Sequence, residues 1–176
     1  GDLIMDLLKP ISYRGMLFFR LLGTAGMEFC TCSLLVGSLY LAVNGLQSVR
    51  MVRAGLFFIS LLFGVTVKFS IQYLFSLLCF YTNNEYGVTK AREVLTNFFS
   101  GALVPLAMFP GFLREMAEWM PFQSVLYTPC GIFIGVFGLE ECVRRMLVQA
   151  VWIVLLWAVG SVLGKKAFGV ISMYGG

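Results

Sequence analysis

The amino-acid sequence predicts an all-α, polytopic membrane protein, and its composition is the main reason. Hydrophobic residues make up 59% of the 176 residues and charged residues only 12%, with a mean hydropathy of +0.87. A typical soluble domain has about 45–50% apolar and about 25% charged residues. A soluble fold of this size has too little interior to bury so much apolar surface, because its surface-to-volume ratio is still high. The lipid bilayer must therefore surround much of the chain.

Four long apolar stretches predict four membrane-spanning helices. A helix of about 20 residues is needed to cross the hydrocarbon core, which is about 30 Å thick. Helices are favoured there because each one pairs its own backbone N–H and C=O groups. The predicted spans are residues 23–43, 56–81, 94–109 and 143–163. The third span is short, and it contains a glycine and a proline.

The segments outside the spans differ in character. Residues 1–15 are amphipathic and charged, and Pro10 interrupts any helix there because it lacks an N–H group. Residues 110–139 are rich in proline and include a short amphipathic piece, 112–120. The apolar stretch that ends this region is too short to span, so it is predicted to re-enter the membrane or to pack at its outer mouth. Residues 164–176 form a short tail, and everything fits one membrane domain.

An even number of spans places both ends of the chain on the same side of the membrane. Basic residues are enriched in cytoplasmic loops, and seven fall on the side of the two ends against five on the other side. Both ends are therefore predicted to be cytoplasmic. The seven are Lys9, Arg14, Arg20, Lys90, Arg92, Lys165 and Lys166, and the five are Arg50, Arg53, Arg114, Arg144 and Arg145.

The residues present argue against several kinds of chemistry. The chain has no histidine, which is the commonest general base and metal ligand. Its net charge of +4 is spread out, so nucleic-acid binding has no electrostatic footprint. Gly160 and Gly164 are separated by three residues instead of the four of a phosphate-binding loop, and Ala167 stands where that loop has Ser or Thr. These glycines are expected to pack against another helix, and any nucleotide hydrolysis is expected from another chain.

Two polar side chains stand out in the second span. Lys68 and Gln72 lie near its middle and four residues apart, so they share one face of a helix. A charge at the bilayer centre costs about 2.5–3.5 kcal/mol and should face protein or water. One interpretation is a polar stripe that lines a translocation path. The other is a lysine that snorkels to the interface or is paired structurally, and the residues alone leave both open.

Charged residues and cysteines near the fourth span have mainly structural interpretations. Glu140–Glu141 and Arg144–Arg145 are three to five residues apart. They are predicted to form salt bridges in the first turns of a helix, with the acidic pair at its positive end. Cys130 and Cys142 both fall in the predicted outer region, where an oxidising compartment would permit a disulfide. Their spacing leaves that pairing open.

Four stretches follow one another in an order that resembles a known family. They are GDLIMDLLKP at residues 1–10, then FSGALVPL at 99–106 with Phe109 and Pro110, then Pro121, Phe122, Tyr127 and Pro129, and finally Gln149 with Trp152. In this order they resemble the integral-membrane subunits of ABC type-2 exporters, especially the bacterial ABC-2 transporter proteins. The resemblance covers nearly the whole chain, although no single stretch is specific by itself.

The resemblance implies a fold and roles for several residues. Family members have a six-helix permease domain, so this shorter chain is similar to a member without its first two spans. Asp2, Asp6, Lys9 and Pro10 would belong to the coupling segment that docks on a cytoplasmic ATPase. The region 105–129 would be the outer helical hairpin that re-enters the membrane and closes the outer gate. Its candidate residues are Pro105, Pro110, Pro121, Phe122 and Pro129.

The function that the resemblance implies is a permease subunit of an ATP-driven exporter in the bacterial cytoplasmic (inner) membrane. Its partners would be a separate ABC ATPase, a second permease copy, identical or related, and the lipid bilayer. The ATPase would hold ATP and magnesium, and this chain would bind no cofactor. Lys68 and Gln72 are the candidate residues of the translocation path, whose substrate the sequence leaves open.

The residues leave two other classes of function open. An intramembrane enzyme, such as a lipid-modifying transferase, needs acids, bases or metal ligands clustered at membrane depth. The chain has only the scattered Lys68, Gln72 and Glu28 there. A membrane scaffold that transports nothing would tolerate loss of both the Lys68 charge and the coupling segment.

Overall fold

The computed structural model describes Gly15, Phe19, Gly23, Met27, Thr82 and the ranges 51–79 and 85–174. The chain separates into two compact units, Gly1–Arg50 and Met51–Gly176. In the first unit the four described residues are helical. The predicted coupling residues Asp2, Asp6, Lys9 and Pro10 lie outside the described residues, as does most of the predicted 23–43 span.

The second unit is built from helices only, within the ranges that the structure describes. Long helices are α3 (Met51–Cys79), α4 (Glu85–Phe99) and α7 (Leu139–Tyr174). Between α4 and α7 stand four short pieces: η2 (Leu106–Met108), α5 (Gly111–Trp119), η3 (Pro121–Ser124) and α6 (Tyr127–Ile134). The predicted all-α class is confirmed, and so is the amphipathic piece expected at 112–120.

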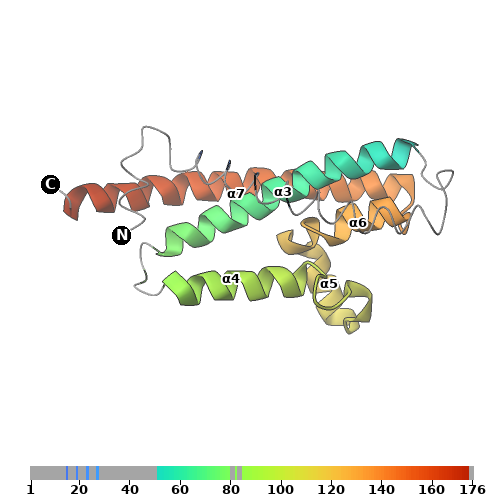
Figure 1. The fold of residues 1–176 in the computed structure, drawn as a ribbon, viewed down its shortest axis with the longest axis horizontal. Helices are drawn as coiled ribbons and strands as arrows, with labels where there is room; N and C mark the ends of the chain where they lie inside the picture. Colours follow the sequence, from blue (N-terminus) through green and yellow to red (C-terminus); the bar gives the residue numbers. More distant parts are fainter. Residues whose placement is uncertain are drawn as a thin grey trace. The chain divides into compact units, whose positions relative to one another are not determined.

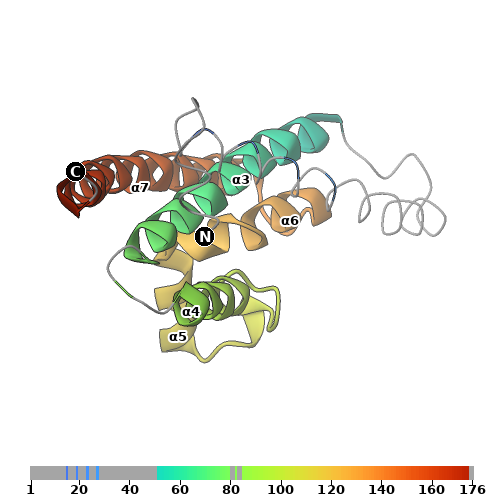
Figure 2. The same cartoon turned by 60° about the vertical axis from the view of Figure 1, so that its left-hand side comes forward.

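Helices α3 and α7 form the framework of this unit and lie side by side (Figures 1 and 2). Within the described residues, they alone are long and apolar enough to cross a membrane, over Val52–Cys79 and Leu139–Lys165. Both helices begin at the same end, because Leu56 and Phe57 of α3 pack against the cluster that contains Cys142 of α7. At the other end the hydroxyl of Tyr73 lies against Gly164, 2.6 Å from where a Cβ would stand, so a larger residue would have to displace it. The packing role expected for this glycine is confirmed.

The third predicted span, 94–109, is not one helix. Helix α4 begins nine residues earlier, at Glu85, and ends at Phe99. Gly101 then takes a left-handed φ of 84°, which glycine adopts without steric cost, and Pro105 has no N–H to continue a helical ladder. With 15 residues α4 is only about 22 Å long, which is less than the hydrocarbon core. Whether the chain crosses the membrane four times therefore stays a prediction.

Helix α4 is amphipathic, with an exposed charged side. There the ammonium group of Lys90 donates a hydrogen bond of 2.8 Å to Glu93. That hydrogen bond lowers the pKa of the Glu93 carboxyl from its ordinary value. At the end of the helix, Phe98 and Phe99 pack on a small core of Leu106, Phe109 and Ala117. This core joins α4 to α5.

Each proline of the 105–129 region stands in the first turn of a helical piece or just before it. Pro105 precedes η2, Pro110 precedes α5, Pro121 opens η3, and Pro129 is the third residue of α6. The first turn of a helix has no internal acceptor for its N–H groups, so proline loses nothing there. The pieces η3 and α6 pack back against α3. The chain in this region is therefore a folded-back series of short helices and not a loop.

Helix α6 ends at Gly135, which takes a left-handed φ of 85°. The N–H groups of Gly135 and Val136 both donate to the carbonyl of Gly131, at 3.0 Å each. The guanidinium of Arg53 occupies the space where a side chain on Gly135 would stand. A cation at the C-terminal end of a helix is favourable, because the free carbonyls there carry negative charge. Arg53 thus joins the beginning of α3 to the end of α6.

We predict that Gly135→Ala destabilises the protein by about 1–2 kcal/mol, the cost of a left-handed conformation for a residue with a Cβ. The added methyl group also displaces the Arg53 guanidinium. Thermal unfolding in detergent, followed by size-exclusion chromatography, measures the change. Gly138→Ala is the matched control, because no atom lies within 4 Å of its added Cβ and its φ is not positive. Equal unfolding temperatures for the two variants would contradict the prediction.

Candidate functional site

A buried polar contact joins the two long helices. The side chain of Gln149 on α7 is completely buried, as is Ser60 on α3. The Ser60 hydroxyl donates to the Gln149 Oε1 atom at 3.0 Å. In return the Gln149 Nε2 group donates to the backbone carbonyl of Ser60 at 3.2 Å. A buried amide is tolerated only when its donors and acceptor are paired, and this arrangement pairs them.

The second N–H group of the Gln149 amide reaches the folded-back region, residues 105–129. It donates at 2.9 Å to the backbone carbonyl of Ser124, the last residue of η3. That carbonyl also lies close to Gly64, where a Cβ atom would stand 2.8 Å from the oxygen. Next to it, the buried Thr128 hydroxyl donates to Gln123 Oε1 at 2.7 Å. We call this group the polar junction; its residues are Ser60, Gln123, Ser124, Thr128 and Gln149.

The polar junction lies well inside the two candidate spans. Ser60 follows Val52 by eight residues, and Gln149 follows Leu139 by ten. These separations correspond to about 12 Å and about 15 Å along the helices, at about 1.5 Å per residue. Non-helical backbone at such a depth is tolerated only where protein or water satisfies its polar groups. Gln149 satisfies the Ser124 carbonyl, so the helical break after η3 is possible at this position.

One polar atom of the junction has no partner among the described residues. The hydroxyl oxygen of Ser124 is fully buried and makes no hydrogen bond there. A buried hydroxyl without a partner costs about 1–3 kcal/mol. The cost of this unpaired hydroxyl offsets part of the stabilisation that the Gln149–Ser124 hydrogen bond gives to the folded-back region.

A charged group lies at the beginning of α7. We call it the arginine cluster; its residues are Arg114, Glu118, Glu141, Arg144 and Arg145. The carboxylate of Glu141 accepts from both Arg144 and Arg145 at 3.1 Å. Glu118 of α5 accepts from Arg114 at 3.1 Å and lies 3.8 Å from Arg145. The predicted salt bridges in the first turns of this helix are confirmed, and they extend to α5.

Arg145 connects two short helices, α5 and α6, and the connection after α6 to α7. Its side chain is only 10% exposed, and its guanidinium carbon lies 4.2 Å from the Phe137 ring centre and 5.5 Å from that of Tyr127. A buried guanidinium needs both ion partners and aromatic faces to offset its lost hydration. Seven residues further along α7, the Trp152 indole N–H donates to the carbonyl of Trp119 at 3.1 Å. Helix α5 is thus attached to α7 at Glu118 and at Trp119.

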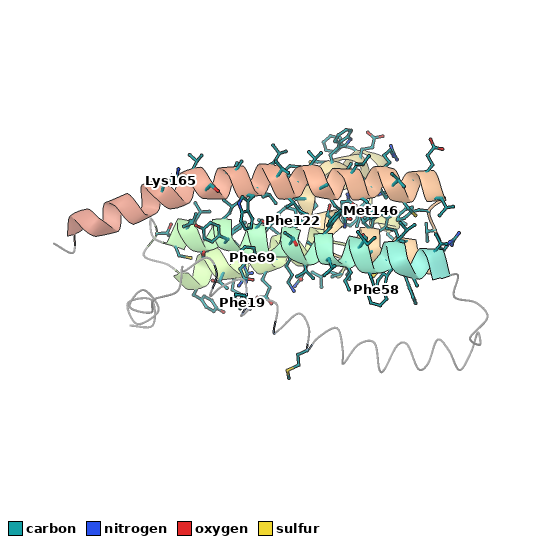
Figure 3. All side chains as sticks on the ribbon, turned by 90° about the horizontal axis from the view of Figure 1, so that it is seen from above. Phe19, Phe58, Phe69, Phe122, Met146 and Lys165 are labelled. Carbon is teal, nitrogen blue, oxygen red and sulfur yellow. The ribbon has the colours of Figure 1, made fainter. Side chains whose placement is uncertain are left out.

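The structure places the predicted path residues on α3, away from the polar junction. Lys68 and Gln72 are both half-buried and one helical turn apart in the Val52–Cys79 segment. Gln72 follows Ser60 by twelve residues, which is about 18 Å along the helix. The face that α3 turns away from α7 carries apolar residues such as Phe58, which is 54% exposed (Figure 3).

The predicted gate residues have separate contacts. Pro105 and Pro110 are exposed, whereas Pro129 is buried in α6. Pro121 is half-buried, and the ring of Phe122 next to it stacks on Phe99 with 6.0 Å between centroids. Hydrogen bonds and ion pairs from α7 hold this region instead, through Gln149, Arg145 and Trp152. The sequence predicts only local salt bridges for Arg145. No spacing pattern in it points to Ser60 or Ser124 as partners of Gln149.

Two further sequence expectations concern cysteines and metals. Cys130 and Cys142 are both free thiols; the former is exposed and the latter buried. No group of three or more potential metal ligands occurs in the ranges that the structure describes. The polar contacts described above for the polar junction and the arginine cluster are hydrogen bonds and ion pairs that position helices.

The sequence of the whole chain matches one known protein family. The family model described as "ABC-2 family transporter protein" matches residues 1–169. The chain belongs to the ABC-2 transporter family. Neither a curated protein nor a solved structure matches it significantly. The family is one of membrane transporters, so α3 and α7 of this ABC-2 protein have the length and composition expected of membrane spans.

The close approach of Gly64 to the folded-back segment leads to a prediction. Gly64→Ala would place a methyl group 2.8 Å from the Ser124 carbonyl oxygen and 3.1 Å from that of Val125. Because both neighbours are backbone atoms, we expect a loss of about 1–3 kcal/mol in stability, as for other overpacked sites. Gly55→Ala on the same helix is the control, since nothing lies within 4 Å of its Cβ. A lower unfolding temperature for the Gly55 variant than for the Gly64 variant would refute the packing argument.

Proposed function

We propose that this ABC-2 protein is the membrane-spanning permease subunit of an ATP-driven exporter and is coupled to a separate ATPase. The observation that carries the proposal is the family match over residues 1–169. The two apolar helices agree with it, because a permease must place its path within the bilayer. The export direction and the ATPase are parts of the proposal.

The translocation path in this proposal runs past Lys68 and Gln72. Both are polar and half-buried within a candidate span, and Lys68 lies near its middle. Polar side chains at that depth usually face the protein interior or a water-filled cavity. The path would lie between this chain and a second copy, identical or related, so that each copy contributes one polar stripe.

The outer gate in this proposal is the folded-back region from Pro105 to Pro129. Its supports are the polar junction at Ser124 and the arginine cluster at Glu118. Both supports are contacts to α7, so a displacement of α7 against α3 would reach the folded-back region directly. Alternating access requires such a two-state element, whose equilibrium a ligand shifts only by binding its states differently. ATP and magnesium, bound by the ATPase, would supply that difference.

The coupling segment in this proposal is residues 1–15, with Asp2, Asp6, Lys9 and Pro10 as contacts to the ATPase. Both ends of the chain would then be cytoplasmic, in the bacterial inner membrane. The five arginines assigned by charge to the outer side include Arg53, Arg114, Arg144 and Arg145. In the second unit these four lie at the end where α3 and α7 begin. That common location agrees with their assignment to one and the same side of the membrane.

The coupling assignment is tested by charge reversal. We expect Asp2→Lys combined with Asp6→Lys in the full-length protein to abolish co-purification of the ATPase and to leave membrane insertion unchanged. The measurement is affinity purification from native membranes in mild detergent, with mass spectrometry of the proteins retained. Glu140→Lys, an exposed reversal at the start of α7, is the control and should retain the ATPase. Undiminished ATPase recovery with the double reversal would remove the segment from the coupling role.

The same preparation separates the other two functions from the proposed one. Turnover of a lipid by the purified protein without any ATPase would favour an intramembrane enzyme. A scaffold is favoured if no ATPase is recovered and if Lys68→Leu also leaves every phenotype intact. A stoichiometric ATPase in the purified complex supports the exporter.

The path assignment is tested by thiol accessibility. In a variant without native cysteines, we expect Gln72→Cys to react with a small, charged, membrane-impermeant thiol reagent, at a rate that changes when a non-hydrolysable ATP analogue is added. Water must reach a translocation path but does not reach a lipid-facing position. Leu62→Cys is the control on the same helix, because Leu62 is 66% exposed on an apolar face. If the Gln72→Cys variant is as unreactive as the Leu62→Cys variant with and without nucleotide, the polar stripe does not line the path.

A further inference from the structure

The short helix η3 lies between two helices that have their own attachments to α3 and α7. Before it, α5 is attached to α7 through Glu118 and Trp119. After it, the end of α6 is held by the guanidinium of Arg53 on α3. A movement of the chain between these attachments can therefore stay local. We call residues 121–125, which comprise η3 and the residue after it, the η3 segment.

The η3 segment lies against α3 with its backbone. The carbonyl oxygens of Ser124 and Val125 would stand 2.8 Å and 3.1 Å from a Cβ atom on Gly64. The Ser124 carbonyl accepts a hydrogen bond from Gln149 at 2.9 Å. The Val125 carbonyl has no helical donor four residues later, because that residue is Pro129 and lacks an N–H group. A hydrogen bond from Gln149 and close packing on Gly64 thus hold this backbone in place.

The side chain of Ser124 opposes this packed arrangement. Ser124 is completely buried, and its hydroxyl has no hydrogen-bond partner among the described residues. The hydroxyl oxygen has almost no accessible surface, so a water molecule has no space beside it. An unpaired buried hydroxyl costs at least as much free energy as a typical hydrogen bond gains. The hydroxyl of Ser124 therefore offsets the hydrogen bond that Gln149 makes to the carbonyl of the same residue.

From these contacts we propose that the η3 segment is a two-state strap. In the packed state, which this structure shows, the segment lies on Gly64. In the released state it separates from α3, and the Ser124 hydroxyl gains water as its hydrogen-bond partner. The two states lie close in free energy, because the packed state pairs the carbonyl of Ser124 but not its hydroxyl.

The other attachments of the folded-back region persist in both states of the strap. Helix α5 keeps its contacts to α7, so release uncovers only the backbone that packs on Gly64. The proposal requires neither an ATPase nor a substrate. It is therefore independent of the proposed export function.

Amide hydrogen exchange of the full-length protein in detergent, measured by mass spectrometry, tests the proposal. The Val125 N–H donates to the Phe122 carbonyl at 3.0 Å, so a peptide covering residues 121–126 reports opening of the segment. Ser124→Ala removes the unpaired hydroxyl and keeps the carbonyl. We expect this peptide to exchange about five- to tenfold more slowly in the variant, because the released state loses its advantage. The α5 peptide, residues 111–120, should exchange at an unchanged rate.

Two further variants establish the cause of the effect. Ser70→Ala is the matched control, because Ser70 is also buried but its hydroxyl donates to the Thr66 carbonyl at 2.9 Å. It should not slow exchange in the 121–126 peptide. Gln149→Met removes the amide that pairs the Ser124 carbonyl, and it should make exchange there several-fold faster. Variants are compared only if they elute like the wild-type protein in size-exclusion chromatography.

The outcomes separate local release from a general change in stability. Slower exchange in Ser124→Ala that is confined to residues 121–126 supports the two-state strap. Unchanged or faster exchange overturns it, because the hydroxyl would then cost the packed state nothing. Equal slowing in the α5 peptide, or in Ser70→Ala, also overturns it, because the effect would not come from the unpaired hydroxyl of the η3 segment. Recovery of the ATPase with the same variants tests the transporter function separately.

Discussion

The pairing of the Ser124 carbonyl by Gln149 is the contact on which the rest of the second unit depends. Between α4 and α7 the chain turns through four short helical pieces, and one of its breaks lies beside α3 and α7 at bilayer depth. An unpaired carbonyl there would cost several kcal/mol in lipid. Gln149 offers two amide donors, and the structure uses one for Ser124 and one for Ser60. The same side chain therefore joins the two long helices and permits the break.

Close approach of backbone is the second condition for this arrangement. Gly64 allows the end of η3 to lie against α3, and Gly164 allows Tyr73 to lie against α7. Without a strong hydrophobic force between helices in lipid, association depends on such van der Waals contact and on interhelical hydrogen bonds. The glycines thus allow the close van der Waals contact, and the polar junction supplies the hydrogen bonds, that together hold α3, α7 and η3 in place. The arginine cluster also joins helices, nearer the beginning of α7. There Arg145 makes contacts through ion pairs and an aromatic ring, where Gln149 uses amide hydrogen bonds.

Much of this could be predicted from local sequence, and some could not. The apolar stretches identify α3 and α7, and the spacing of Glu141 with Arg144 and Arg145 correctly predicts their salt bridges. The apolar content of residues 94–109 predicts a single helix, but α4 ends at Phe99 and the left-handed Gly101 and Pro105 follow it. The resemblance included Gln149, but its partners Ser60 and Ser124 are 89 and 25 residues away. Periodicity on one helix contains no information about such distant pairs.

The sequence by itself determined that this ABC-2 protein is helical and suited to lipid, since hydropathy and helix-breaking residues act locally. It also predicted one short piece of the folded-back region, the amphipathic segment 112–120 that the structure shows as α5, but not where η2, η3 or α6 begin. Only the tertiary structure decided which polar groups meet, and therefore which breaks are stabilised. It likewise decided that Phe112 and Trp119 of α5 are exposed while Glu118 of the same helix lies 3.8 Å from Arg145 of α7. The reason is that burial and hydrogen bonding across long sequence separations depend on how helices pack, which no single segment specifies.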